Sequence, residues 1–113
     1  MAACPNASQT VSDQPTLQDF DQLNDWQRHG DGLVGGSLTR ELRFAHFRAA
    51  FAFMAEVALV AERQDHHPDW SNRYNRVTLS ITSHDVGRLT DRDLRFARAV
   101  DAIAQRHAAA NAS

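Results

Sequence analysis

The chain has 113 residues, enough for one domain with a single modest hydrophobic core. Its formal net charge of -2 excludes the strongly basic surface that binds nucleic acid or anionic lipid. Its one cysteine, Cys4, excludes a disulfide framework and a cysteine-based metal site.

The N-terminal segment is rich in Ser, Gln, Asn, Asp and Pro and has few large apolar side chains. Such a composition buries too little surface to offset the entropy of ordering, so we predict a flexible tail over 1–15 and one domain over 16–113. The segment lacks the charged and apolar regions of a signal peptide, and no apolar run approaches the roughly 20 residues of a membrane span. We therefore expect a soluble, cytoplasmic protein.

The hydrophobic pattern beyond the tail predicts seven elements. They run helix, strand, strand, helix, strand, strand, helix over residues 16–25, 26–34, 37–44, 45–65, 70–74, 76–83 and 90–109. Thr16 with Asp19 forms a capping box that opens the first helix, and Gly35-Gly36 suits a hairpin turn. Hairpin-joined strands with separate helices imply an α+β fold, a four-stranded antiparallel sheet with three helices packed on one face.

The long helix over 45–65 carries a wide apolar surface. Its apolar residues form two adjoining stripes, one of Phe47, Phe51 and Met54 and one of Phe53, Val57 and Val60. We interpret the first stripe as core rather than as a cofactor site. One sheet face need not cover both stripes, and a leftover stripe is most stable against a copy of itself, so we expect a homo-oligomer. The alternative is that the other two helices cover it within one monomer.

The densest group of ionisable side chains runs from Glu62 to Trp70 and contains the adjacent histidines His66 and His67. Histidine is well suited to proton transfer at neutral pH, and a helix C-terminus favours its protonated form. His84 ends the fourth strand, so general acid–base chemistry is one interpretation of the group. The alternative is structural, with the paired imidazoles capping the helix and His84 only ending a strand.

Other patterns also allow two interpretations. Glu62 and His66 lie four apart on one helical face, and His84 could complete a metal site, although no HExxH or paired Cys/His spacing supports it. Asp93 closes a capping box with Thr90, which is enough to explain it without a catalytic role.

Two aromatic residues follow the histidine group. Trp70 and Tyr74 either stack on a bound heterocycle or pack on the sheet, and their spacing favours neither.

Several short blocks form one pattern when taken together. They are Phe51-Ala52-Phe53-Met54, Val57-Ala58-Leu59, Ala61-Glu62, Asp65-His66-His67-Pro68-Asp69-Trp70, Tyr74-Asn75-Arg76-Val77, His84 and Leu89-Thr90-Asp91-Arg92-Asp93. In this order and spacing they resemble the pterin-4a-carbinolamine dehydratase family over residues 16–107, with the first hairpin matching loosely and the leader not at all. The DHHP-x-W block, with a histidine and an aspartate at the right distance, is the most specific part.

The resemblance implies a fold and a site. The family fold is a four-stranded antiparallel sheet with three helices on one side, in agreement with the predicted elements. The implied active-site histidines are His66, His67 and His84. The implied substrate-binding residues around them are Glu62, Asp65, Pro68, Trp70, Arg92 and Asp93.

The resemblance also implies a reaction, the dehydration of a 4a-hydroxytetrahydropterin to a quinonoid dihydropterin and water in tetrahydrobiopterin recycling. An acid, for which we favour His67, protonates the leaving hydroxyl, and His66 or His84 takes the N5 proton. Asp93 is expected to orient an imidazole or the pterin. No metal or organic cofactor is expected, because both charge movements are proton transfers.

Two positions depart from the family pattern. Ser83 stands where threonine is usual, and Arg88 stands where glycine is usual, which leaves the loop conformation after His84 open unless Gly87 compensates.

The expected partners are a pterin substrate and further copies of the chain, as a dimer or tetramer. A functional link to an aromatic amino acid hydroxylase is implied, without direct contact to nucleic acid or membrane. Two functions from other classes compete with the enzyme: a dimerisation cofactor for a homeodomain transcription factor, and a metal-binding protein.

Overall fold

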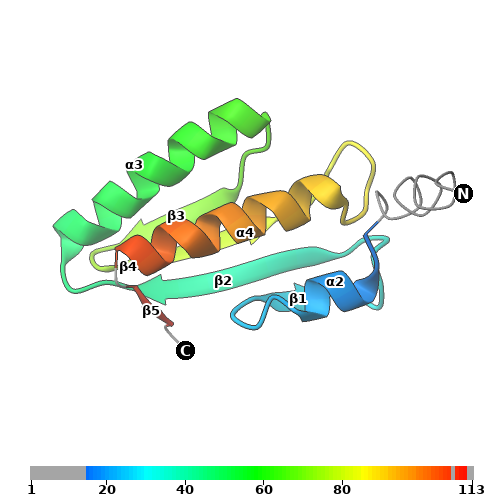
Figure 1. The fold of residues 1–113 in the computed structure, drawn as a ribbon, viewed down its shortest axis with the longest axis horizontal. Coiled ribbons are helices and arrows are strands. Elements are labelled where there is room, and N and C mark those ends of the chain that lie inside the picture. Colours follow the sequence, from blue (N-terminus) through cyan, green and yellow to red (C-terminus); the bar gives the residue numbers. More distant parts are fainter. Residues whose placement is uncertain (1–14, 108, 112–113) are drawn as a thin grey trace, which may run out of the picture.

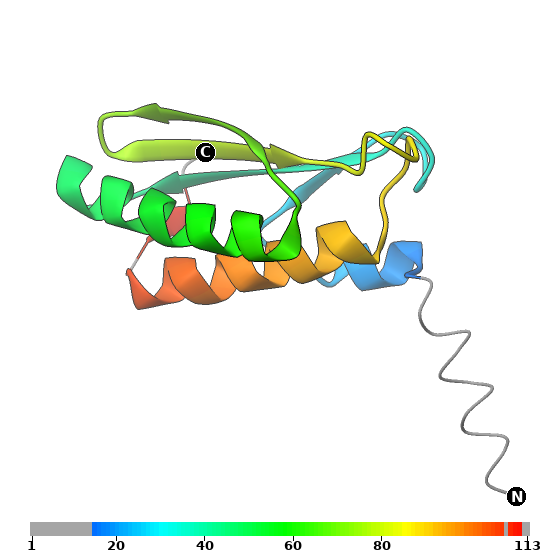
Figure 2. The same ribbon diagram turned by 90° about the horizontal axis from the view of Figure 1, so that it is seen from above.

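The computed structural model describes residues 15–107 and 109–111, so the predicted tail, apart from Pro15, lies outside the described residues. Within them, three helices lie on one face of an antiparallel sheet (Figure 1, Figure 2). The predicted α+β fold, with its order of helices and strands, is therefore confirmed. No helix in the described part of the chain is long and apolar enough to cross a membrane.

The sheet is built from two antiparallel hairpins. Its strands are β1 (Gln27–His29), β2 (Ser37–Arg43), β3 (Asp69–Arg73) and β4 (Arg76–Ile81), in the spatial order β1-β2-β4-β3. The central pair β2 and β4 runs from Leu38 opposite Ile81 to Arg43 opposite Arg76. A two-residue strand, β5 (Ala110–Asn111), adds to the end of β2 and was not among the predicted elements.

The first strand is shorter than predicted. It was expected over 26–34, but β1 ends at His29, because Gly30 adopts a positive φ of 98° that breaks the extended backbone. The rest of the segment forms a loop that is hydrogen-bonded to the loop after β4. In that loop the Gly35 N–H donates to the Gly87 carbonyl and the Leu89 N–H donates to the Leu33 carbonyl.

Local caps set where the helices begin. The helices are α2 (Leu17–Asp21), α3 (Phe47–Gln64) and α4 (Asp91–Arg106). The predicted capping boxes of α2 and α4 are both present, with Thr16 and Thr90 as N-caps. The helix α2 ends before the predicted residue 25, since the turns that follow it carry Leu23 and Trp26 into the core.

The core lies between the sheet and the two long helices, which run antiparallel side by side across it (Figure 1, Figure 2). The stripe of α3 that contains Phe53, Val57 and Val60 is buried there. The prediction that the other stripe is core was wrong for its aromatic residues: Phe47 is 45% exposed and Phe51 58% exposed. Because one stripe already fills the contact with the sheet and α4, the second faces outward.

Candidate active site

One end of the molecule gathers the predicted site residues. The helix α3 ends there, β3 starts there, and the loop that joins β4 to α4 closes the same end (Figure 1). Because β3 pairs with β4 from Asp69 opposite Ser80, the residues just before β3 lie beside the residues just after β4. The antiparallel pairing therefore brings residues 66–68 close to residues 82–84.

The end of α3 turns the chain inward. Asp65, the C-cap residue, adopts the left-handed conformation with a φ of 51°, and its own side chain is exposed. The next backbone N–H, that of His66, donates to the Ala61 carbonyl over 3.0 Å, which closes the last turn. Pro68 follows, half-buried, where the chain enters β3. This sharp reversal places the two adjacent histidines in different environments.

His66 is buried and paired with a carboxylate. It is only 6% exposed, and its Nε2 lies 2.7 Å from Oδ1 of Asp93, which is itself fully buried. The edge-on ring of Phe96, 5.9 Å away between centroids, packs against the imidazole. Such a pair sits at two complementary helix ends: the C-terminus of α3 favours positive charge and the N-terminus of α4 favours negative charge.

The second oxygen of Asp93 is occupied by other donors. Its Oδ2 accepts hydrogen bonds from Ser83 Oγ at 2.8 Å and from the Thr90 backbone N–H at 2.9 Å. The hydroxyls of Ser83 and Thr90 lie 2.7 Å apart. The capping box predicted for Asp93 is thus present, but the same side chain also holds an imidazole and a strand-end serine. Hydrogen bonds to both of its oxygens fix the orientation of this buried carboxylate.

The other two histidines are exposed at the same end. Nε2 of His67 lies 3.1 Å from Oε1 of Glu62, one turn back on α3. Nε2 of His84 lies 3.6 Å from Oδ2 of Asp69, at the start of β3. All four side chains are more than half exposed, so both imidazoles can reach a molecule that approaches from solvent.

Arg92 fastens the loop that carries His84. Its guanidinium Nη2 donates to Oδ1 of Asp85 over 2.7 Å, and this contact lowers the pKa of the Asp85 carboxyl and raises the pKa of Arg92. Gly87 supplies a positive φ of 65°, and Ser83 and Arg88 form an antiparallel bridge across the turn. In this turn the positive φ belongs to Gly87, and Arg88 does not adopt one.

Trp70 takes part in packing. It lies on β3 opposite Leu79, half-buried, and packs against the core cluster. Tyr74 is 66% exposed in the turn after β3, with a φ of 53°. The structure thus brings His66, Asp93 and Ser83 into one network, whereas Trp70 contributes mainly to the core.

The predicted site residues did not include Ser83, Asp69 or Asp85, although all three make contacts at this end of the fold. A signal for Ser83 was present: Val77, Leu79 and Ile81 alternate inward on β4, and the same alternation continued two residues further points Ser83 inward. The two aspartates carry no such signal, since their contacts depend on how β3 and the loop meet.

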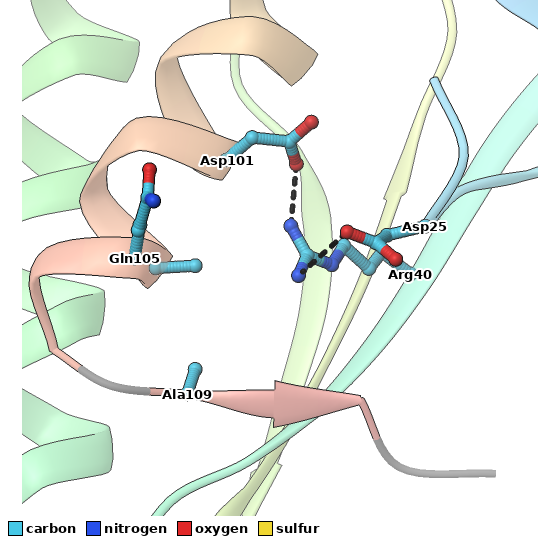
Figure 3. A pocket seen from close by; sticks show the side chains of 6 residues that line it. Asp25, Arg40, Asp101, Gln105 and Ala109 are labelled. Atoms are coloured by element: carbon cyan, nitrogen blue, oxygen red, sulfur yellow. Dashed lines mark hydrogen bonds and ion pairs between the residues drawn. The ribbon is translucent and has the colours of Figure 1, made fainter. Parts of the chain in front are cut away.

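A polar pocket that contains none of the histidines lies beside the C-terminal half of α4 (Figure 3). It has a volume of about 340 Å³ and is lined by Asp25, Arg40, Asp101, Ala104, Gln105 and Ala109. The Arg40 guanidinium points between the two carboxylates, and Trp26 Nε1–H donates to Asp101 over 2.7 Å. Burial raises the pKa of the Asp101 carboxyl, against the opposing effects of Trp26 and Arg40.

The arrangement of the histidine end is suited to proton transfer. One imidazole is held by a buried carboxylate, and two more lie in solvent next to carboxylates. No group of three or more His, Cys, Asp or Glu side chains within residues 15–107 and 109–111 is placed to hold a metal ion.

Comparison with known proteins identifies the family. The family model described as pterin 4 alpha carbinolamine dehydratase matches residues 9–103. The chain belongs to this family. The match begins inside the N-terminal segment, earlier than the resemblance over 16–107 implied.

Similar proteins carry the same family name. One from Rhizorhabdus wittichii, named "Putative pterin-4-alpha-carbinolamine dehydratase", is 44% identical over 95 residues, which cover 84% of this chain and 95% of that protein. Another with this name, from Synechococcus sp. (strain WH7803), is 48% identical over 81 residues, or 72% of this chain and 82% of that protein.

Solved structures of pterin dehydratase relatives share the fold. A transcriptional coactivator/pterin dehydratase from Brucella melitensis has a TM-score of 0.69 and 41% identity, over 77% of this chain and 89% of that one. A pterin dehydratase-like protein identified as a RuBisCO assembly factor in the alpha-carboxysome has a TM-score of 0.60 over 72% of this chain and 90% of that one. At 22% identity, this second likeness shows the fold alone.

Proposed function

We propose that the chain is a dehydratase that converts a 4a-hydroxytetrahydropterin into a quinonoid dihydropterin and water. The observation that carries this proposal is the buried pair of His66 and Asp93, placed at the same end of the fold as His67 and His84. A capping residue alone needs no imidazole partner, so the pair supports a chemical role over a purely structural one.

The reaction requires two proton movements and one bond cleavage. The C4a–O bond breaks as the hydroxyl receives a proton and leaves as water, while N5 loses its proton and forms a double bond to C4a. His67 is our candidate for the acid, because its imidazole is exposed and its Nε2 lies 3.1 Å from Oε1 of Glu62, which orients the ring. Both steps are acid–base chemistry and need no metal or organic cofactor.

Two histidines are candidates for the base that takes the N5 proton. If Nε2–H of His66 donates to Asp93, Nδ1 of the same ring is left as the proton acceptor. His84 is 78% exposed and can reach the substrate without any movement of the core. Separate His66→Gln and His84→Gln variants distinguish them. A general base is inactive once it is protonated, so only loss of the base removes the fall in rate at low pH.

The remaining predicted site residues would shape the substrate-binding region. Glu62 and Asp65 border the histidines from the end of α3, and Pro68 fixes the chain direction after them. Arg92 would act through the loop that it holds at Asp85. These assignments follow from the family resemblance, and the contacts above are compatible with them.

The cellular context follows from the chemistry. A 4a-hydroxytetrahydropterin is produced when an aromatic amino acid hydroxylase oxidises its pterin, so such an enzyme would supply the substrate and the product would re-enter tetrahydrobiopterin recycling. We propose a cytoplasmic location on the same ground. The decisive experiment is a dehydration assay on chemically prepared carbinolamine, in which a rate no faster than the uncatalysed reaction would reject the enzyme.

A second copy of the chain is our candidate for covering the exposed stripe of α3. Phe47, Phe51 and Leu59 are 45%, 58% and 61% exposed along one side of this helix. The rings of Phe47 and Phe51 also contact each other, with centroids 5.8 Å apart. An apolar row of this kind on a small domain is typical of a self-association surface.

A binding role without chemistry is the second candidate function. It is favoured by the coactivator role named for the Brucella melitensis relative and by the same exposed stripe. A partner protein that binds a variant lacking all three histidines as tightly as the unmodified chain would support it.

A further inference from the structure

Ser83 is a buried hydroxyl without a direct part in the proposed reaction. It is 1% exposed and stands just before His84, where β4 has ended. Its Oγ donates to Oδ2 of Asp93 over 2.8 Å and lies 2.7 Å from the hydroxyl of Thr90. A polar group this deeply buried is costly unless it is hydrogen-bonded, so the two contacts fix the side chain.

The start of α4 does not account for the Ser83 contact. The capping box needs only Thr90 and Asp93, whose side chains and backbone N–H groups satisfy each other. Ser83 reaches the same carboxylate from a different segment, ten residues earlier in the chain. It therefore adds a second donor to Oδ2 of Asp93, which already accepts a hydrogen bond from the Thr90 backbone N–H.

The shortest contacts of this network favour one arrangement of the hydrogens, although the Thr90 hydroxyl also lies 3.5 Å from Oδ2 of Asp93. An ionised Asp93 only accepts, so Ser83 donates to its Oδ2, and the Thr90 hydroxyl then donates to Ser83. Oδ1 stays directed at the imidazole of His66, whose Nε2 is 2.7 Å away. A carboxylate oxygen that only accepts requires a hydrogen on the nitrogen that faces it, which here is Nε2.

From this geometry we propose that Ser83 is a positioning residue, which orients His66 through the shared carboxylate of Asp93. By holding Oδ2, it prevents the carboxylate from rotating and so fixes both the direction and the tautomer of the imidazole. Its effect on the reaction rate rests on the proposed dehydratase function. Its effect on the imidazole does not.

The kinetic test uses three variants. Ser83→Ala should lower kcat for the 4a-hydroxytetrahydropterin by about 10- to 100-fold, with little change in KM and with a displaced pH–rate profile. Ser83→Thr keeps the hydroxyl and should keep both the rate and the profile. The matched control is Ser80→Ala. Ser80 also lies on β4, but it alternates with the buried residues and points away from the core, so its replacement should change neither the rate nor the pH–rate profile.

Nitrogen-15 NMR of the imidazoles provides a readout independent of catalysis. His66 should show one Nε2–H tautomer in the unmodified protein and exchange with the Nδ1–H tautomer in Ser83→Ala. If the unmodified protein does not dehydrate the carbinolamine, the proposed function fails while the tautomer still tests Ser83.

Ser83→Cys, a weak donor of similar size, replaces the alanine variant if thermal unfolding shows that Ser83→Ala does not fold. The cysteine variant should change rate and tautomer in the same direction. Full kcat, an unchanged pH–rate profile and a single tautomer in a folded alanine or cysteine variant would overturn the proposal.

Discussion

The imidazole Nε2 of His66 lies 2.7 Å from the carboxylate Oδ1 of Asp93, although the two residues are 27 positions apart in the chain. The contact joins the end of α3 to the first turn of α4. Both partners are almost completely removed from solvent, at 6% and 0% exposure. A hydrogen bond in this environment is strong, and the loss of either partner leaves a buried polar group without one.

Asp93→Asn is therefore expected to impair both catalysis and folding. The amide places two donor hydrogens where Oδ1 or Oδ2 accepted, so at least one of its present donors loses an acceptor. We expect a loss of about 1–3 kcal/mol in the free energy of unfolding and a dehydration rate lower by roughly 100-fold or more. Urea unfolding and the dehydration assay measure the two effects.

Asp91→Asn is the matched control, since Asp91 is an exposed aspartate in the same helical turn, 3.4 Å from Arg95. It should leave the rate unchanged and the stability nearly so. Equal losses in both variants would mean that Asp93 acts only as part of the helix start.

His67→Ala tests the assignment of the acid. The side chain is 56% exposed, so its removal creates no cavity and the thermal unfolding midpoint should barely move. The dehydration rate should fall by about 100-fold or more, the usual contribution of general acid–base catalysis. His29→Ala, which removes an exposed histidine from β1, is the control and should keep full activity. A folded His67→Ala protein with the unmodified rate would show that another group is the acid.

Local patterns explain why part of this site was predictable. The capping box joins Thr90 to Asp93, three positions later in the chain, so the sequence alone predicts it and the structure confirms it. The pairing of Asp93 with His66 depends on how α3 docks beside α4, which no local pattern specifies. The histidines were therefore found as a group, whereas the different environments of His66 and His67 required the fold.

The two stripes of α3 show a similar limit. Apolar spacing predicted a helix and its wide apolar surface correctly, but it did not say which stripe faces the sheet. Phe53 is fully buried and Phe51, two residues earlier, is 58% exposed. The choice depends on the rotation of α3 against β4 and α4, which is a property of the packed core.

The proposed mechanism predicts insensitivity to metal removal. Protonation of the leaving hydroxyl and removal of the N5 proton both use imidazoles, so no step requires a Lewis acid. Exhaustive dialysis against a chelator should leave the dehydration rate unchanged, and added zinc should not increase it. Stoichiometric zinc in active protein, with activity lost on its removal and restored on its return, would contradict the mechanism.

The contacts of Glu56 are expected to make the interaction between the two long helices sensitive to acid. Its carboxylate on α3 contacts Nε2 of His107 at 2.6 Å and Nη2 of Arg106 at 2.7 Å, both at the end of α4. The hydrogen bond from His107 is the main cause that lowers the pKa of Glu56 below its ordinary value of 4.5. The charged carboxylate therefore stabilises the fold above pH 4.5, and this contribution is lost as the pH falls through the lowered pKa.

Glu56→Gln should remove that part of the pH dependence. Its thermal unfolding midpoint should be lower than that of the unmodified protein at neutral pH, and the difference should shrink as the pH falls below 4.5. Glu41→Gln, an exposed carboxylate on β2, is the control. A constant difference between Glu56→Gln and the unmodified protein across the whole pH range would reject the link.

The exposed stripe of α3 predicts a homo-oligomer. Phe51 and Leu59 are each more than half exposed on a helix whose other side already fills the core, so their apolar surface gains most from contact with a second copy. Light scattering at micromolar concentration should give a multiple of 12.6 kDa, with a two-fold dimer as the smallest closed assembly.

Phe51→Glu should shift the mass toward the monomer, because it places a charge in the contact. Arg98→Glu, an exposed charge reversal on α4, is the control for nonspecific charge effects. A single species of 12.6 kDa for the unmodified protein would mean that the stripe remains in solvent or binds a different partner.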